Sequence, residues 1–308
     1  MKRQGTFPFT AIIGQEEMKK ALVLNVVNPR LGGVLIQGEK GTAKSTAVRA
    51  LADLLPPRLC IKGCKFHDDP NDKSNWCDEC HEKYDNAAPE TEELPMKVVE
   101  LPVSATEDRV VGTLDIEAAI KEGKRSFETG ILADANRNIL YVDEINLLDD
   151  HVVDVLLDSA AMGINTVERE GISYSHPARF SLVGTMNPEE GDIRPQLLDR
   201  FALSVYVAGE KDLDKRAEVI KRRLEYEDDP EEFIKKWEEE QQNEVHRIQR
   251  AMKLLPQVTT SNEILRMAAR ISITLGVDGH RADIVLIKTA ASKLHGCEID
   301  AADCPDLV

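Results

Sequence analysis

A glycine-rich loop, GEKGTAKST at residues 38–46, carries residue types that could hold a phosphate group. In loops of this kind, backbone N–H groups surround a phosphate, a lysine neutralises the terminal phosphates and the hydroxyl after it binds Mg²⁺. Lys44 and Ser45 stand at those two places. Ala43 replaces the last glycine of the pattern G-x-x-x-x-G-K-[ST], and alanine is acceptable there if the residue keeps a negative φ. The loop predicts a nucleotide site, with an ordinary glycine turn as the alternative.

Two carboxylates follow an apolar run, ILYVDE, at residues 139–144. If the run is a central strand of an open α/β sheet, its carboxyl end is where ligands bind. Asp143 is then placed to hold the Mg²⁺ shell, and Glu144 to polarise the water that attacks ATP. The alternative is a strand that simply ends in solvated acids.

Polar residues after the next apolar run extend the candidate hydrolysis site. Asn187 ends the run in LVGTMNPEEGDIRPQLLDRF and can position the attacking water beside Glu144. Arg200 sits where one subunit could present a guanidinium to its neighbour's γ-phosphate, a contact worth on the order of 10³-fold in rate. Arg194 is a weaker candidate for this role, and either arginine could instead be a structural ion-pair partner.

The elements that must position these residues alternate between strands and helices. We expect four strands from apolar runs, at 33–37, in MKVVELP, at 139–144 and over 179–187, and two short β runs around EREG. We expect helices over 12–27, from the phosphate loop to about Leu55, in LDIEAAIKEG, in GILADANRN and at 150–161. A polar insertion over 56–95 interrupts this pattern. This alternation predicts an α/β fold with a parallel sheet flanked by helices on both faces.

The remainder of the chain shows only helical patterns, with apolar residues at helical spacing across 211–293. We therefore expect a nucleotide-binding α/β domain over 1–210 and a small all-α lid domain over 211–308. The charge run EYEDDPEEFIKKWEEEQQNE is interpreted as a solvated helix face, because opposite charges interleave at helical spacing.

The amino-acid composition argues against a protein that binds nucleic acid or membranes. The 308 residues include 39 basic and 55 acidic side chains, so the net charge of −16 repels nucleic-acid backbones and anionic membrane surfaces. The sequence has no apolar stretch of about 18 residues and no signal-peptide core near its start. We expect a cytoplasmic protein that binds neither nucleic acid nor membrane.

With these residues in place, the sequence resembles the ATPase (I) subunit of magnesium chelatase, a family of ring-forming AAA+ proteins. The resemblance covers nearly the whole chain, and the block LPVSATEDRVVGTLDIEAAIKEGKRSFETGILADANRNILYVDEINLLDDHVVDVLLDSAA carries most of its specificity. It implies Walker A residues Lys44 and Ser45, Walker B residues Asp143 and Glu144, sensor 1 Asn187, an arginine finger at Arg200 and a sensor 2 arginine at Arg281. The family's own loops with alanine at the place of Ala43 imply a working nucleotide site.

The resemblance also implies ligands, surfaces and partners. ATP and Mg²⁺ are the implied cofactors, with Ile12, Ile13 and Gly14 near the adenine and the loop residues Gly38, Glu39, Lys40, Gly41, Thr42, Ala43, Lys44, Ser45 and Thr46 at the phosphates. Residues 113–130 correspond to the family's helix-2 insertion and 163–177 to the hairpin before sensor 1. The implied partners are a homo-oligomeric ring of six copies, an integrin-like subunit and a large tetrapyrrole-binding subunit on which chelation occurs.

The insertion over 56–95 contains a separate group of metal-ligand types. Cys77 and Cys80 form a C-x₂-C pair, and Cys64 with either Cys60 or His67 could complete a four-ligand site, with His81 nearby. Similar ATPase subunits often carry GC-x-x-x-C as the upstream half, and Asp68 stands where its second cysteine would be. Zinc is the simpler expectation, whereas an iron–sulfur cluster would need the additional thiol of Cys60. Free cysteines without metal are the alternative.

Three other functions compete with a chelatase motor. A nucleic-acid motor with similar insertions is disfavoured by the net acidity and by a hairpin with only Arg169 as a cation, between Glu168 and Glu170. An AAA+ remodeller that inserts a metal or cofactor into a protein would use the same ATPase residues. A nucleotide-binding scaffold without turnover is disfavoured by Glu144, Asn187 and Arg200 together.

Overall fold

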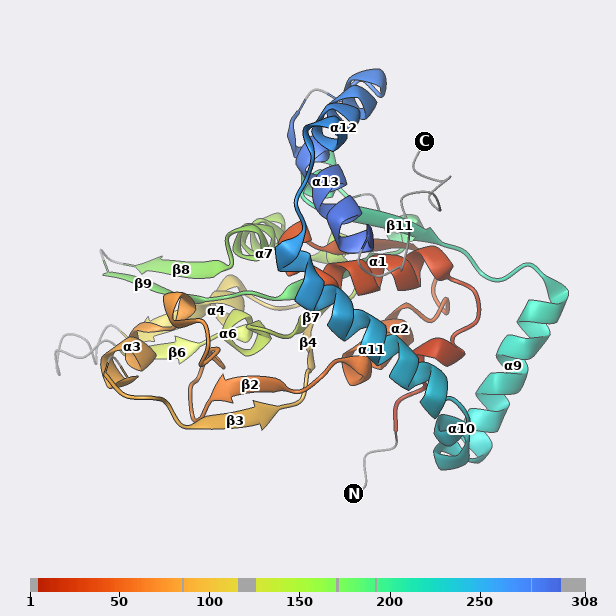
Figure 1. The fold of residues 1–308 in the computed structure, drawn as a ribbon, viewed down its shortest axis with the longest axis horizontal. Helices are drawn as coiled ribbons and strands as arrows, with labels where there is room; N and C mark the ends of the chain where they lie inside the picture. Colours follow the sequence, from red (N-terminus) through yellow and green to blue (C-terminus); the bar gives the residue numbers. More distant parts are fainter. Residues whose placement is uncertain are drawn as a thin grey trace.

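A five-stranded parallel sheet forms the centre of the computed structural model (Figure 1). The structure describes residues 5–84, 86–115, 126–169, 172–191, 193–277 and 279–294. The strand order is β11-β1-β10-β7-β4, with bounds Leu203–Val207, Val34–Gly38, Ser181–Met186, Ile139–Val142 and Val98–Leu101. The predicted parallel sheet is confirmed, and all four strands expected from apolar runs belong to it.

Helices cover both faces of this sheet because successive strand residues point to opposite sides. On β1, Val34 and Ile36 pack into one apolar cluster, whereas Leu35 packs into another. The first cluster is covered by α1 (Glu16–Val27), α2 (Lys44–Leu54) and α11 (Glu238–Leu254). The second is covered by α4 (Glu107–Val111), α6 (Ile131–Ala135) and α7 (Asp150–Met162). The prediction of helices on both faces is therefore confirmed.

The insertion over 56–95 contains short regular elements that its polar sequence did not indicate. The strands β2 (Arg58–Ile61) and β3 (Thr91–Leu94) pair antiparallel, and η3 (Lys73–Asn75) and α3 (Asp78–Tyr84) lie between them. A third apolar cluster joins Phe66, Trp76 and Cys77 of the insertion to Leu114 and Tyr174 outside it.

Two hairpins lie on the same side of the molecule as this insertion (Figure 1). The strands β5 (Gly112–Asp115) and β6 (Ser126–Thr129) pair with each other, as do β8 (Ile164–Arg169) and β9 (Ile172–Pro177). The β runs expected around EREG are confirmed as β8 and β9. The helix expected from Leu114 is wrong for Leu114 and Asp115, because both pair with β6, and residues 116–125 lie outside the described residues.

Helices make up the described chain after β11. They are α9 (Leu213–Asp228), α10 (Pro230–Lys236), α11, α12 (Asn262–Thr274) and α13 (Arg281–Leu294), after the short α8 (Pro195–Leu198) that precedes β11. Figure 1 shows α12 and α13 projecting from the sheet, whereas α11 runs across it, with Ile248 and Ala251 buried in the apolar cluster beneath α1 and α2. The boundary at residue 210 stays a prediction. No helix among the described residues is long and apolar enough to cross a membrane.

Candidate nucleotide site

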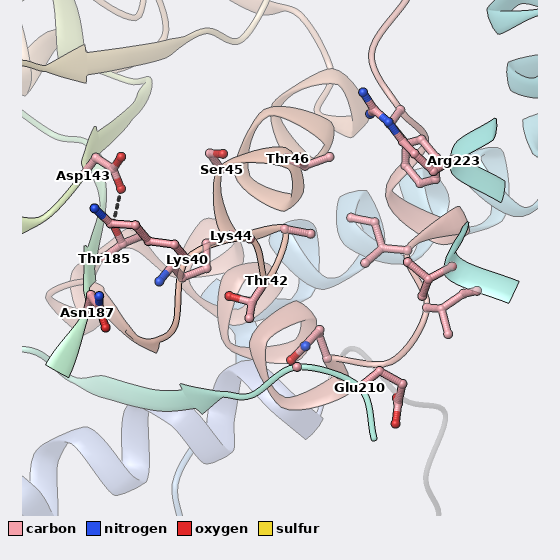
Figure 2. Close-up of a pocket in the computed structure, with 18 of the residues that line it drawn as sticks. Lys40, Thr42, Lys44, Ser45, Thr46, Asp143, Thr185, Asn187, Glu210 and Arg223 are labelled. Atoms are coloured by element: carbon pink, nitrogen blue, oxygen red, sulfur yellow. Dashed lines mark hydrogen bonds between the residues drawn. The ribbon is translucent and has the colours of Figure 1, made fainter. Parts of the chain in front are cut away.

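A cavity of about 700 Å³ opens at the carboxyl ends of β1, β7 and β10 (Figure 2). It brings together most of the residues that the sequence assigned to nucleotide binding and hydrolysis. Those lining it are Ile12, Ile13, Lys40, Gly41, Thr42, Ala43, Lys44, Ser45, Thr46, Asp143, Glu144 and Asn187. Gly14, Gly38, Glu39, Arg200 and Arg281 do not line it.

The phosphate loop leaves β1 through two constrained backbone positions. Gly38 has φ 152°, and a Cβ there would lie 2.0 Å from the carbonyl oxygen of Val207, so only glycine fits beside β11. Ala43 has φ 61° and ψ 20° and immediately precedes α2. The condition set for alanine at this position, a negative φ, is therefore not met: the turn from loop to helix requires a left-handed residue, which costs a non-glycine residue about 1–2 kcal/mol.

Lys44 holds the loop together from within. Its Nζ donates hydrogen bonds to the carbonyl oxygens of Gly38 and, at 3.2 Å, Glu39. Burial lowers the pKa of Lys44 from its ordinary value, although the nearby carboxylates of Asp143 and Glu144 oppose this shift. The ammonium group thus lies inside the cavity mouth, with hydrogen bonds that a phosphate oxygen could replace.

Asp143 is oriented by two hydroxyl groups from the sheet. Its Oδ1 accepts hydrogen bonds from Tyr141 at 2.9 Å and from Thr185 at 2.5 Å, and Figure 2 shows the latter contact at the cavity wall. Burial raises the pKa of Tyr141, which keeps its hydroxyl a donor. Sequence reasoning missed both residues, whose signal is a polar position near the end of each buried strand.

Glu144 follows in a left-handed conformation, with φ 53°. Its carboxylate lies 3.2 Å from Nζ of Lys40, which also lies 2.5 Å from the carboxylate of Glu190. The hydrogen bond to Glu190 is the main cause that raises the pKa of Lys40, and the same contact lowers the pKa of Glu190. A lysine of the phosphate loop therefore forms an ion pair with Glu144.

Asn187 lies directly after β10 and is buried, at 6% exposure. Its Oδ1 accepts a hydrogen bond from the backbone N–H of Glu189 at 3.3 Å. This contact fixes the amide at the cavity wall on the side of Asp143 (Figure 2).

The other end of the cavity is formed by α9 and the segment before α1, and it combines apolar side chains with charged ones. Ile12 and Ile13 line it together with Phe7, Arg222 and Arg223. Arg222 donates a hydrogen bond to the carbonyl oxygen of Ala11 at 3.0 Å, which joins α9 to the segment before α1. Sequence reasoning missed the two arginines, because charged residues are frequent along their helix and nothing distinguishes the positions that face the cavity.

The three arginines proposed to act on a γ-phosphate lie outside the cavity. Arg200 pairs with Asp154 at 3.2 Å and Asp158 at 2.7 Å on α7. Arg281 donates a hydrogen bond from Nη2 to the backbone carbonyl of Arg200. Arg194 pairs with Asp150. The structure brings Arg200 and Arg281 together but places neither at the cavity of its own chain.

The cysteine-rich insertion gathers a different set of ligands from the expected one. Cys64, Cys77 and Cys80 lie together, and the fourth member of the group is Asp68. The thiol of Cys60 instead contacts the carbonyl oxygen of Arg58 at 3.7 Å, and His67 lies outside the group as well. The backbone explains the difference for Cys60, since β2 holds that residue in its pairing with β3 before the chain turns towards Cys64.

Comparisons with known proteins show which family this chain is similar to. Residues 86–201 match the model of the AAA domain, dynein-related subfamily. The chain is 59% identical over 94% of its length to a magnesium-chelatase subunit ChlI homolog of Methanocaldococcus jannaschii, covering 79% of that protein. It is 51% identical over 92% of its length to the magnesium-chelatase 38 kDa subunit of Chlorobaculum tepidum, covering 73% of it.

A solved structure agrees with these relatives. It describes the complex between subunits BchI and BchD of magnesium chelatase, built on a single-particle cryo-EM reconstruction. One of its chains is 43% identical to this one with a TM-score of 0.61, and the match covers 94% of both chains.

Proposed function

Because the chain belongs to the ChlI/BchI family of magnesium-chelatase ATPase subunits, we propose that it hydrolyses ATP to drive Mg²⁺ insertion into a tetrapyrrole through partner subunits. The observation that carries this proposal is the cavity in which the phosphate loop, Asp143, Glu144 and Asn187 meet. A chain of this family with that set of residues has the parts needed for turnover as well as for binding.

The cavity has two chemically distinct ends that fit ATP. One end offers the apolar side chains of Ile12 and Ile13 to the adenine, and the loop end offers Lys44 and backbone N–H groups to the phosphates. Ser45 and Asp143 would hold Mg²⁺, since both lie at the cavity and supply the oxygen ligands that this ion prefers. When bound, the ion neutralises charge on the phosphates. Tyr141 and Thr185 keep Asp143 aimed at this position.

Glu144 would accept the proton of the attacking water, with Asn187 holding that water in line. Lys40 must leave Glu144 for this to occur. The phosphates of incoming ATP compete for the lysine, so binding would free the carboxylate for catalysis.

Arg200 and Arg281 would act on a neighbouring copy in a homo-oligomeric ring of six subunits. Support comes from their shared position outside the cavity of their own chain. ATP held between copies would close the ring, and hydrolysis would release it and rotate the helical domain. An integrin-like subunit and a large tetrapyrrole-binding subunit would receive this movement.

A variant that binds ATP but hydrolyses it slowly tests which partner subunits the chain acts on. Glu144→Gln should bind ATP but hydrolyse it slowly, and so retain its partners in extracts of the source cell. We expect a large tetrapyrrole-binding subunit to be held in ATP and lost in ADP, and Lys44→Ala, which cannot hold the phosphates, to retain none in either. An unrelated metalloenzyme held in ATP would overturn the tetrapyrrole assignment.

A further inference from the structure

Three thiols and one carboxylate of the insertion over 56–95 converge at a single point. The ligand atoms of Cys64, Asp68, Cys77 and Cys80 all lie within 4.8 Å of one another. Cys64 is half-buried and the other three are buried. These residues come from the turn after β2 and from the start of α3, so the chain must fold back on itself to bring them together.

The spacing of the sulfur atoms suits tetrahedral coordination. The Sγ atoms of Cys64 and Cys77 are 3.9 Å apart. A tetrahedral zinc ion with Zn–S bonds of about 2.3 Å separates its sulfur ligands by about 3.8 Å. The backbone N–H of Phe66 also donates to Sγ of Cys64 at 3.4 Å, a contact that stabilises a metal-bound thiolate.

Asp68 provides a second and independent observation. It is 1% exposed, and its Oδ2 accepts a hydrogen bond from the backbone N–H of Cys77 at 2.7 Å. Its Oδ1 has no hydrogen-bond partner among the described residues. Burying a carboxylate oxygen without a partner is costly unless a cation binds it.

We propose that Cys64, Asp68, Cys77 and Cys80 bind one Zn²⁺ ion as a structural site. Three thiolates and a carboxylate are ligands that zinc accepts, and four protein ligands leave no position for a substrate. An iron–sulfur cluster would need a fourth thiolate. The thiol of Cys60 is engaged elsewhere, with the carbonyl oxygen of Arg58 and, at 3.6 Å, with Nη1 of Arg137.

The ion would fix a segment that joins three parts of the molecule. Phe66, between two of the ligands, stacks on His176 of β9 with ring centroids 4.6 Å apart. Its carbonyl oxygen accepts a hydrogen bond from Nδ2 of Asn136 at 2.6 Å, just before β7. Arg137 donates to the carbonyl oxygen of His67 at 3.1 Å. Zinc therefore secures the insertion against the hairpin β8–β9 and the segment entering the Walker B strand.

Metal analysis of the full chain, purified without chelator, tests the proposal. We expect one zinc per chain, and replacement by Co²⁺ should give the absorption of tetrahedral cobalt with sulfur-to-cobalt charge transfer. Cys77→Ser and Cys80→Ser should lose the zinc, and the isosteric Asp68→Asn should release it more readily to a chelator. Cys60→Ser is the matched control, a buried cysteine of the same insertion, and should retain the zinc.

A second measurement remains informative if a serine variant fails to fold. Chelation of the wild-type protein should lower its melting temperature, and Zn²⁺, but not Mg²⁺, should restore it. Four results would overturn the proposal: wild-type protein that takes up neither zinc nor cobalt, iron with acid-labile sulfide, a Cys64–Cys77 disulfide in freshly isolated protein, or loss of zinc from Cys60→Ser. None of these readouts depends on ATP hydrolysis.

Discussion

At the scale of single residues, Glu144 and Glu190 share one partner, but only Glu144 has a proposed catalytic role. Both contact Lys40, yet only Glu144 follows the Walker B strand next to Asp143. We expect Glu144→Gln to lower the rate of ATP hydrolysis by roughly 10²–10⁴-fold, because a general base is lost, while ATP affinity is retained. Glu190→Gln should keep most of the hydrolysis. Phosphate release and calorimetric ATP binding distinguish the two, and equal losses in both variants would contradict the assignment.

The left-handed conformation of Ala43 gives a second prediction at this scale. Glycine adopts φ 61° without penalty, whereas a β-branched residue is strongly disfavoured there. Ala43→Gly should therefore retain ATP binding, and Ala43→Val should weaken it by roughly 5- to 30-fold, since roughly 1–2 kcal/mol of strain is added to the bound loop. Equal nucleotide affinities for the two variants would show that this backbone conformation does not govern the loop.

At the scale of elements, the hairpin β8–β9 contains a histidine that must stay neutral. His176 is buried, its Nδ1 lies 2.9 Å from the carbonyl oxygen of Pro177 and its Nε2 lies 2.9 Å from Nδ2 of Asn165. A ring protonated only on Nδ1 satisfies both neighbours, whereas a second proton would oppose the Asn165 amide. Burial, the largest cause, lowers the pKa of His176.

This shift predicts the direction of a pH dependence. The unfolded chain protonates this histidine near pH 6.5, and the folded chain does so only at lower pH, so the unfolded state binds more protons in between. The free energy of unfolding should fall as the pH drops from about 7 to about 5, and His176→Gln should show a smaller fall. Chemical denaturation across this range measures the slopes. Parallel slopes for both proteins would contradict the prediction.

Elements with a strong apolar pattern could be predicted from the sequence, and elements stabilised by distant contacts could not. The strands β1, β7 and β10 are apolar runs buried on both faces, so periodicity and length identify them. The strand β3, TEEL, is polar and exists because it pairs with β2. The helix expected at Leu114 fails for the same reason, since pairing with β6 overrides helical spacing.

The candidate nucleotide and metal sites also contain some residues that local sequence predicts and others that only distant contacts position. Motif residues such as Lys44 and Asp143 could be predicted because their chemistry fixes their spacing. The conformation of Ala43 depends on how the loop meets α2, and Asp68 joins the cysteines only through the folding of the insertion. Arg222 reaches the cavity from a distant helix, which no local pattern indicates.

At the scale of the whole molecule, the placement of Arg200 predicts that active sites are shared between copies. Arg200→Ala and Lys44→Ala should each lose most hydrolysis, but their mixture should recover part of it, because Arg200 of one copy would serve the intact cavity of its neighbour. Arg194→Ala is the control and should remain active alone. Mixed assemblies with no recovery of phosphate release would place Arg200 outside the reaction.

Metal insertion in a reconstituted system is the most direct test of whether this ATPase drives a chelatase. The wild-type chain or Glu144→Gln would be combined with BchD-type and tetrapyrrole-binding chelatase subunits, ATP and Mg²⁺, and metallation of the tetrapyrrole followed by its absorption. We predict insertion with the wild-type chain and almost none with Glu144→Gln, although the variant still assembles with its partners. Equal metallation with both, or ATP hydrolysis by the wild-type assembly without any metallation, would contradict the proposal that this ATPase drives a chelatase.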